Sequence, residues 1–424
     1  MRARCALLAL VVAGLAPAVV RADIWTWDGE TSELEVRNFY KSMATGLRLP
    51  LGLAEALEAP AYGALWTHTT RTWGHLVLRK RLELQAGWQL GALISSDRAF
   101  AGGTVPGSTV PLADAPTARR RLVDFDPVLL TRGGLSLYHD LDLLAIKVST
   151  SHADVTVGRQ VLSWGSGRLW NPTDLLSPFA PTDVDREVRR GVDAVRVSIP
   201  LAATAQLEVL WLPLPELRDN GGVVRAQVNV RGFDIAPSVA KYVRDAVFGL
   251  DVTGDAGPLG VHAEAAWTAA LDRNDQARRD EFLRAVTGVD VRPANDLVLS
   301  AEYYFNGWGA ADPSGYLAVL RSARVLRGEV FGAGRHYLGL TGSWMASGLL
   351  TVRGAAITNL FDPSLLIIPT LEYSAEQHVL VRAGGYLPLG RRSEPDRTTG
   401  NLVLRSDYGA SPLGVFAQIE IYLL

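Results

Sequence analysis

Cysteine is almost absent from this 424-residue chain, since Cys5 is the only one. A basic start, the apolar run Ala6–Val20 and a small-x-small ending predict a secretory signal peptide over residues 1–22. A retained membrane anchor is the alternative, but the run is short for a spanning helix and contains Pro17. Cys5 precedes the run, which excludes a lipoprotein anchor. Cleavage of the signal peptide would remove this cysteine and leave the mature chain without disulfide or thiolate chemistry.

Long apolar runs and a surplus of positive charge are missing as well. No run of eighteen apolar residues follows the signal, so membrane-spanning helices are not expected. Without the three arginines of the signal, 39 of the 42 basic residues remain against 44 acidic ones, a net charge of 39 − 44 = −5. A nucleic-acid partner is therefore not expected. Yet 48% of residues are hydrophobic, so these residues must be distributed along the chain between polar ones and not in long apolar runs.

Hydrophobic residues fall on every second position in four segments, 76–94, 259–269, 296–306 and 413–423. Side chains of a strand point alternately to opposite faces, so each segment has one apolar and one hydrated wall. Weaker candidates bring the count to sixteen, with 122–131 and 401–408 as optional additions: 33–41, 135–148, 153–163, 192–199, 203–212, 223–233, 246–253, 281–291, 335–346, 348–359, 364–374 and 377–387. Such repetition predicts an all-β fold, a transmembrane antiparallel up-and-down β-barrel of 16 or 18 strands over residues 23–424.

The connections support a barrel with two unlike ends. Short turns at 149–153, 253–259, 291–296, 346–348 and 374–377 alternate with long polar connections at 95–121, 164–191, 270–281, 307–334 and 388–400. Outer-membrane barrels have short periplasmic turns and longer external loops. This alternation fails once between residues 223 and 253, which indicates a miscounted strand there. Hydrophobic spacings of three and four predict short loop helices at 237–247 and 316–327.

Residues 157–197 contain three motifs in order: Gly158-Arg159-Gln160, Ser163-Trp164-Gly165 and Asn171-Pro172-Thr173-Asp174. Over about forty residues the sequence here resembles porin-like outer-membrane proteins related to the alginate-export barrels, many of which have no assigned substrate. The resemblance implies a porin-like barrel in which this segment leaves a strand as a long, ordered loop. It does not imply alginate, because the sequence shows no dense arginine ladder for a polyuronate.

The 164–191 connection is unusually apolar and rich in proline, so we expect it to fold back into the lumen. Its charges would then form a constriction of both signs, which sets selectivity in pores. Equally, the charges could pair with the lumen wall and brace the loop, and the two roles are compatible. We expect Arg159 to face the lumen and pair with a loop acid, and Arg79, Arg81 and Glu83 to share a lumen wall. The candidate constriction and lumen residues are Arg159, Arg168, Asp174, Asp183, Asp185, Arg186, Glu187, Arg189, Arg190, Arg79, Arg81 and Glu83.

The sequence contains no recognisable catalytic or metal-binding motif, so no cofactor and no enzymatic activity are expected. The leading hypothesis is an outer-membrane channel for diffusion or export of small solutes. The runner-up is a barrel for hydrophobic molecules or lipids with a periplasmic partner, favoured if Leu169, Trp170 and Phe179 line an apolar inner surface. A plugged structural or adhesion barrel and a lipid hydrolase are more distant. The expected surroundings are the outer membrane of a Gram-negative cell, with its lipid, lipopolysaccharide and barrel-assembly machinery. Deleting residues 168–188 should raise conductance and reduce ion selectivity.

Overall fold

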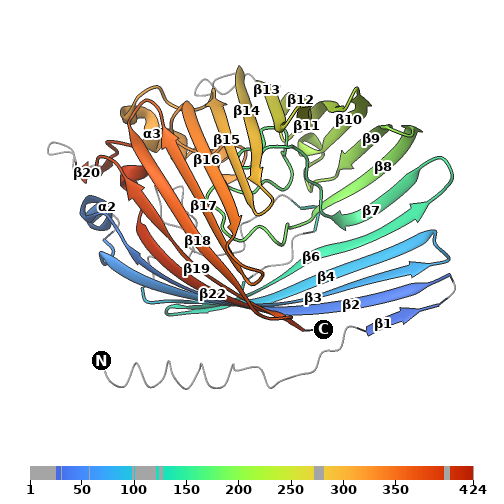
Figure 1. Ribbon diagram of the computed structural model, residues 1–424, viewed down its shortest axis with the longest axis horizontal. Helices are drawn as coiled ribbons and strands as arrows, with labels where there is room; N and C mark the ends of the chain where they lie inside the picture. The colour runs from blue at the N-terminus through green and yellow to red at the C-terminus, as the bar shows by residue number, and fades with distance from the viewer. Residues whose placement is uncertain are drawn as a thin grey trace.

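A computed structural model describes residues 25–29, 31–56, 58–97, 100, 121–123, 128–271, 281–395 and 402–423 (Figure 1). Twenty strands form one sheet, and eighteen of them close into an antiparallel barrel because β22 pairs with both β19 and β2. The two further strands are β1 (Trp25–Asp28), added to β2, and β5 (Val128–Arg132), added to β6. The predicted signal peptide, residues 1–22, lies outside the described residues.

The barrel strands follow one another around the wall in chain order. They are β2 (Glu33–Arg48), β3 (Tyr62–Leu78), β4 (Leu82–Ser95), β6 (Leu135–Ser149), β7 (Asp154–Gln160), β8 (Val192–Ala202), β9 (Ala205–Leu212), β10 (Gly221–Val230), β11 (Phe233–Tyr242), β12 (Asp245–Ala256), β13 (Leu259–Ala270), β14 (Glu281–Ala294), β15 (Leu297–Asn306), β16 (His336–Met345), β17 (Leu350–Asn359), β18 (Ser364–Glu376), β19 (Val379–Leu389) and β22 (Leu413–Leu423).

The alternation predicted from sequence separates an apolar outer face from a polar inner one. On β4, Trp88 and Leu90 are exposed on the outside, whereas Gln89 between them is 3% exposed and faces inward. On β13, Trp267 is exposed, and His262 and Glu264 are buried on the inner side. The same division recurs around the barrel, so its outer wall is a band of exposed hydrophobic side chains.

The two ends of the barrel differ as expected. The last residues of β22 pair with the first part of β2, and this pairing defines one end of the barrel. Short turns such as 231–232 and 257–258 lie at this end. The long connections lie at the other end and contain α2 (Leu51–Ala56), α3 (Tyr316–Leu320), α4 (Ala323–Leu326), η3 (Pro313–Gly315) and η4 (Tyr408–Ala410), and the hairpin of β20 (Glu394–Pro395) and β21 (Leu402–Val403). The helices in the described part of the chain lack the length and hydrophobicity of a membrane-spanning helix.

Several sequence-based assignments are corrected, and they explain the strand count. The predicted helix 237–247 is wrong, because these residues form the end of β11, a two-residue turn at 243–244 and the start of β12. The segment 76–94 is not one strand but the end of β3, a turn at 79–81 and β4. Adding β3 and β11 to the sixteen predicted strands gives eighteen. The helical prediction at 316–327 is confirmed by α3 and α4.

Candidate functional site

The connection between β7 and β8, residues 161–191, folds inside the barrel, where it appears as a green segment in Figure 1. We call it the constriction loop. It re-enters the wall where the Gly191 N–H donates to the Asp142 carbonyl at 3.0 Å. Just before the loop, Arg159 pairs with Asp193 of β8 at 2.8 Å and also donates to the Leu141 carbonyl. Arg159 is 5% exposed, so it braces the wall beneath the loop; the expected pairing with a loop acid is wrong.

Two wall carboxylates bind the backbone of the loop's first half. Glu264 of β13 accepts the N–H groups of Ser166 and Gly167 at 2.7 and 2.9 Å. Glu302 of β15 accepts the N–H groups of Leu169 and Trp170 at 3.0 and 3.4 Å. Charged acceptors on backbone N–H groups are among the stronger hydrogen bonds of a protein. The first half of the loop is therefore fixed to the β13–β15 wall.

The backbone conformation of the loop explains the glycine in the Ser163-Trp164-Gly165 motif. Gly165 has φ +100°, a backbone region that favours glycine, and a Cβ there would lie 2.7 Å from Glu264 Oε1. The motif thus lets the loop turn closely over the carboxylate that binds it. Trp164 itself donates from Nε1 to Glu208 of β9 at 3.2 Å.

The apolar residues after the motif anchor the loop on the same wall. Trp170 stacks on Tyr304 with ring centroids 5.1 Å apart and planes at 11°. Leu169 and Trp170 are each 3% exposed and join an apolar cluster contributed by β14 to β19 and β22. Gly339 of β16 leaves room for them, because a Cβ there would lie 2.3 Å from Leu169. The expected folding of this apolar loop into the lumen is confirmed.

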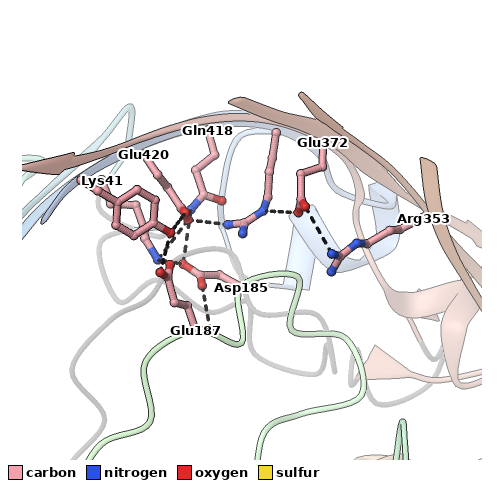
Figure 2. A network of polar contacts seen from close by, with 9 residues as sticks. Lys41, Asp185, Glu187, Arg353, Glu372, Gln418 and Glu420 are labelled. Carbon is pink, nitrogen blue, oxygen red and sulfur yellow. Dashed lines mark hydrogen bonds and ion pairs between the residues drawn. The ribbon is translucent and has the colours of Figure 1, made fainter. Parts of the chain in front are cut away.

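The second half of the loop reaches the wall formed by β2 and β22 (Figure 2). Lys41 Nζ lies 2.5 Å from Asp185, 3.1 Å from Glu187 and 3.1 Å from Glu420. Tyr422 donates to Glu187 at 2.5 Å. The three carboxylates lie close enough to hold a metal ion, but the Lys41 ammonium already contacts all three.

The polar contacts continue from this anchor along the inner wall. Glu420 pairs with Arg382, which contacts Glu372 at 2.9 Å, and Glu372 is 3.2 Å from Arg353 (Figure 2). Although burial acts to raise it, the nearby Lys41 ammonium holds the pKa of the Asp185 carboxyl below its ordinary value. Asp185 therefore stays ionised and attached over the neutral and mildly acidic range.

Contacts inside the loop hold its remaining charges. Asp174 accepts from Ser163 and from Arg189, at 2.8 and 2.7 Å, and its burial raises the pKa of its carboxyl. Arg186 donates to the backbone carbonyls of residues 168, 180, 181 and 183, at 2.6 to 3.2 Å. Arg189 also lies 4.3 Å from the ring centre of Phe179. The loop is a folded unit with its own polar core.

A water-accessible cavity of about 620 Å³ remains between the loop and the wall from β3 to β9. Charges of both signs line it, namely Arg71, Lys147, Arg186, Arg189 and Arg196 with Glu83, Asp154 and Glu187. Three of the arginines face carboxylates that lie deeper in the protein: the side chains of Asp142, Asp174 and Glu208 are 1%, 1% and 5% exposed. The cavity surface therefore presents more positive than negative groups.

The structure brings together six of the predicted site residues, which are Asp174, Asp183, Asp185, Arg186, Glu187 and Arg189, all within the constriction loop. Glu83 faces the cavity from β4 and contacts Lys147 at 3.0 Å. Arg168 pairs with Asp290 of β14 at 2.6 Å, and Arg190 lies 4.0 Å from Asp140. Arg79 and Arg81 are misplaced in the prediction, because they lie in the turn between β3 and β4 and not on a strand face.

Sequence reasoning missed the wall partners of the loop, Lys41, Glu264, Glu302 and Glu208. Glu264 and Glu302 lie on the polar faces of two clearly alternating segments, which marks them as inward-facing. Sequence does not show that a loop 91 to 134 positions away binds the wall at these two residues. Lys41 is one of only four lysines in the chain, and this rarity was the one available signal.

Comparisons with known proteins place the fold. No family model and no curated protein matches the chain. Among solved structures, the Pseudomonas aeruginosa OccK5 structure has a TM-score of 0.54 at 10% identity, covering 91% of this chain and 97% of that one. Acinetobacter baumannii OccAB3 gives 0.53 at 9% identity, covering 92% and 98%. At this identity the similarity shows the barrel fold alone, and the relation to alginate-export barrels stays a prediction.

Proposed function

We propose that this protein is an outer-membrane channel through which small hydrophilic solutes diffuse. The observation that carries the proposal is the constriction loop, which is anchored to opposite inner walls and leaves a charged, water-accessible cavity of about 620 Å³ beside it. The apolar outer band fits hydrocarbon, and the long loops would then face outward from the cell. In this setting lipid, lipopolysaccharide and the barrel-assembly machinery are the expected surroundings.

The pathway would select by width and charge. Arg71, Arg189 and Arg196 reach the cavity surface, whereas their partner carboxylates lie behind them. An ion in the cavity therefore meets guanidinium groups first, and charged groups at a narrow point set pore selectivity. We infer a preference for anionic over cationic solutes, with the constriction loop setting the size limit.

Reconstitution in planar bilayers tests this proposal. The folded protein should conduct, and its reversal potential under a salt gradient should show anion preference. Arg196→Gln should reduce that preference, because it removes one positive group while Glu208 keeps Trp164 and, at 3.7 Å, Arg225. Arg231→Gln, in the exposed 231–232 turn, is the matched control and should leave the reversal potential unchanged. A folded barrel without conductance, or equal effects of both variants, would overturn the proposal.

The runner-up, a barrel for hydrophobic molecules or lipids, needs an apolar inner surface around Leu169, Trp170 and Phe179. Leu169 and Trp170 are packed against the wall at 3% exposure, so they offer no such surface in this conformation. Liposome swelling with sugars, compared with uptake of a hydrocarbon by the same liposomes, separates the two functions. We therefore favour the hydrophilic channel.

A further inference from the structure

The outer face of β2 and β3 carries a polar patch in the middle of an otherwise apolar surface. Register and alternation place its residues outside the barrel, since Lys41 of β2 contacts the loop inside and Thr67 and Thr69 of β3 are buried on the inner side. We call the patch the polar island, and its members are Asn38, Tyr40, Ser42, His68, Thr70 and Thr72.

Apolar residues frame the polar island on both neighbouring strands. Ile421 and Ile419 of β22 pair with Tyr40 and Ser42, and Leu90 and Ala92 of β4 pair with Thr70 and His68. Lipid hydrocarbon offers no hydrogen-bond partner, so polar side chains at this depth are costly unless another group satisfies them. The island is therefore unlike the rest of the outer band.

Contacts within the island satisfy only part of its capacity. Asn38 Nδ2 donates to Thr72 Oγ1 at 2.7 Å, and Tyr40 OH and His68 Nδ1 are 2.7 Å apart. Each hydroxyl and each amide can make further hydrogen bonds, and His68 Nε2 has no partner among the described residues. Ser42 Oγ also accepts from Trp66 Nε1 at 2.8 Å, and Thr70 donates to Asn38 Oδ1 at 3.5 Å. The island's side chains point away from the barrel, and their remaining donors and acceptors can bond to a neighbour.

An apolar groove of about 500 Å³ lies beside the island and extends from β2 and β3 onto the neighbouring strands β22 and β4. Its outward-facing floor consists of small residues, Ala44, Gly46, Ala64 and Ala417, and Trp66 and Val415 rise at its edges. Val415 is 62% exposed, a large fraction for an apolar side chain. Small residues on a lipid-facing surface allow a second protein backbone to approach closely.

We propose that the polar island and its groove form the surface on which a second copy of this chain packs within the bilayer. The island holds no carboxylate, lysine or arginine, and its side chains both donate and accept hydrogen bonds. Such a surface can meet a copy of itself without charge repulsion, as a symmetric interface requires. The groove supplies the close approach, and the exposed Val415 supplies a side chain to enter it. The inference rests on the barrel lying in a membrane, as proposed above.

The experiment compares two double variants, each placing two leucines on the outer face of one strand. Ala44→Leu with Gly46→Leu fills the groove, and a Cβ at Gly46 meets only Val415 at 3.6 Å, so the monomer tolerates it. Gly354→Leu with Ala356→Leu is the control on β17, where a Cβ at Gly354 meets nothing within 4 Å. Each protein is extracted from membranes in polymer-bounded lipid particles, and the protein mass per particle is measured.

The wild type and the β17 variant should give particles containing more than one chain, and the groove variant should fall to the mass of one chain. Thr70→Val with Thr72→Val should lower the multichain fraction without adding bulk. Wild-type particles that hold a single chain, with or without tightly bound lipid at the island, would overturn the inference. So would a groove variant that stays multichain. Conductance of the single-chain groove variant tests the channel proposal separately, because loss of assembly does not require loss of the lumen.

Discussion

Lys41 of β2 and Asp185 of the constriction loop are 144 positions apart in the chain, yet the Lys41 ammonium lies 2.5 Å from the Asp185 carboxylate. This contact joins the far half of the loop to the wall opposite β13–β15. The loop therefore crosses the lumen between two fixed points, one made by the wall carboxylates Glu264 and Glu302 and one by Lys41.

Lys41→Met should loosen the far half of the loop. Among the described residues, Lys41 is the one cation that contacts Asp185, Glu187 and Glu420 together, and its removal leaves three carboxylates with oxygen atoms within 4.8 Å of one another. Their repulsion should detach the loop intermittently, so single-channel records should show frequent current steps to a higher level. Lys80→Met, in the exposed turn between β3 and β4, is the control. A quiet record for Lys41→Met would contradict the anchor.

Glu302→Gln should destabilise the folded barrel. The carboxylate accepts N–H groups of the loop and lies 2.8 Å from His262 Nε2, and hydrogen bonds to charged groups contribute about 1.5–3 kcal/mol each. The free energy of unfolding, measured in detergent with urea, should fall by a few kcal/mol, and the loop should become sensitive to protease. Glu376→Gln, exposed at the end of β18, should change neither quantity.

The barrel could be predicted from sequence because lipid on one side and a polar lumen on the other impose a strict period of two. The prediction failed at β3 and β11 for separate physical reasons. The outer face of β3 carries His68, Thr70 and Thr72, so its hydrophobic alternation is lost over the polar island. A turn of only two residues joins β11 to β12. The hydrophobic residues of the two strand ends therefore fall at spacings of three and four over residues 237–247, which is the spacing typical of a helix.

The candidate site was predicted in part. The apolar, proline-rich composition of residues 164–191 indicated a loop that folds inward, and this segment packs against the inner wall through Leu169 and Trp170. Its binding partners could not be predicted, because they depend on which strands meet across the lumen. Arg168 of the loop, for example, pairs with Asp290 of β14, which lies 122 positions further along the chain. No local pattern encodes such a pairing.

Gly165→Ala should disturb the loop more than an equivalent change elsewhere. The added Cβ would lie 2.5 Å from Asn171 Oδ1 and 2.7 Å from Glu264 Oε1, at a backbone φ of +100°. Backbone strain of this kind costs about 1–3 kcal/mol, and the steric contact adds to it. Gly133→Ala is the control, since it shares a positive φ of +63° but has nothing within 4 Å. Equal losses in the free energy of unfolding for the two variants would show that strain alone, and not the fit over Glu264, requires Gly165.

The loops at the long-loop end should respond to pH through Asp407, which lies between β21 and β22. Burial raises the pKa of its carboxyl to about 6, and nearby Asp362 acts in the same direction, against hydrogen bonds from Tyr337 and from the Ala333 N–H. A folded-state pKa above the unfolded value means that Asp407 stabilises the fold fully at pH below about 4, and that this contribution is lost as the pH rises through about 6.

Asp407→Asn should remove this pH dependence, because an amide keeps the acceptor oxygen but does not ionise. Protease resistance of the long-loop end should decline between pH 4 and pH 7 in the wild type and stay nearly flat in the variant. Asp312→Asn is the matched control, because Asp312 lies in the same set of loops but its carboxyl is fully exposed and, among the described residues, accepts hydrogen bonds from Ser314 alone. A wild-type profile that Asp407→Asn leaves unaltered would assign the pH response to another group.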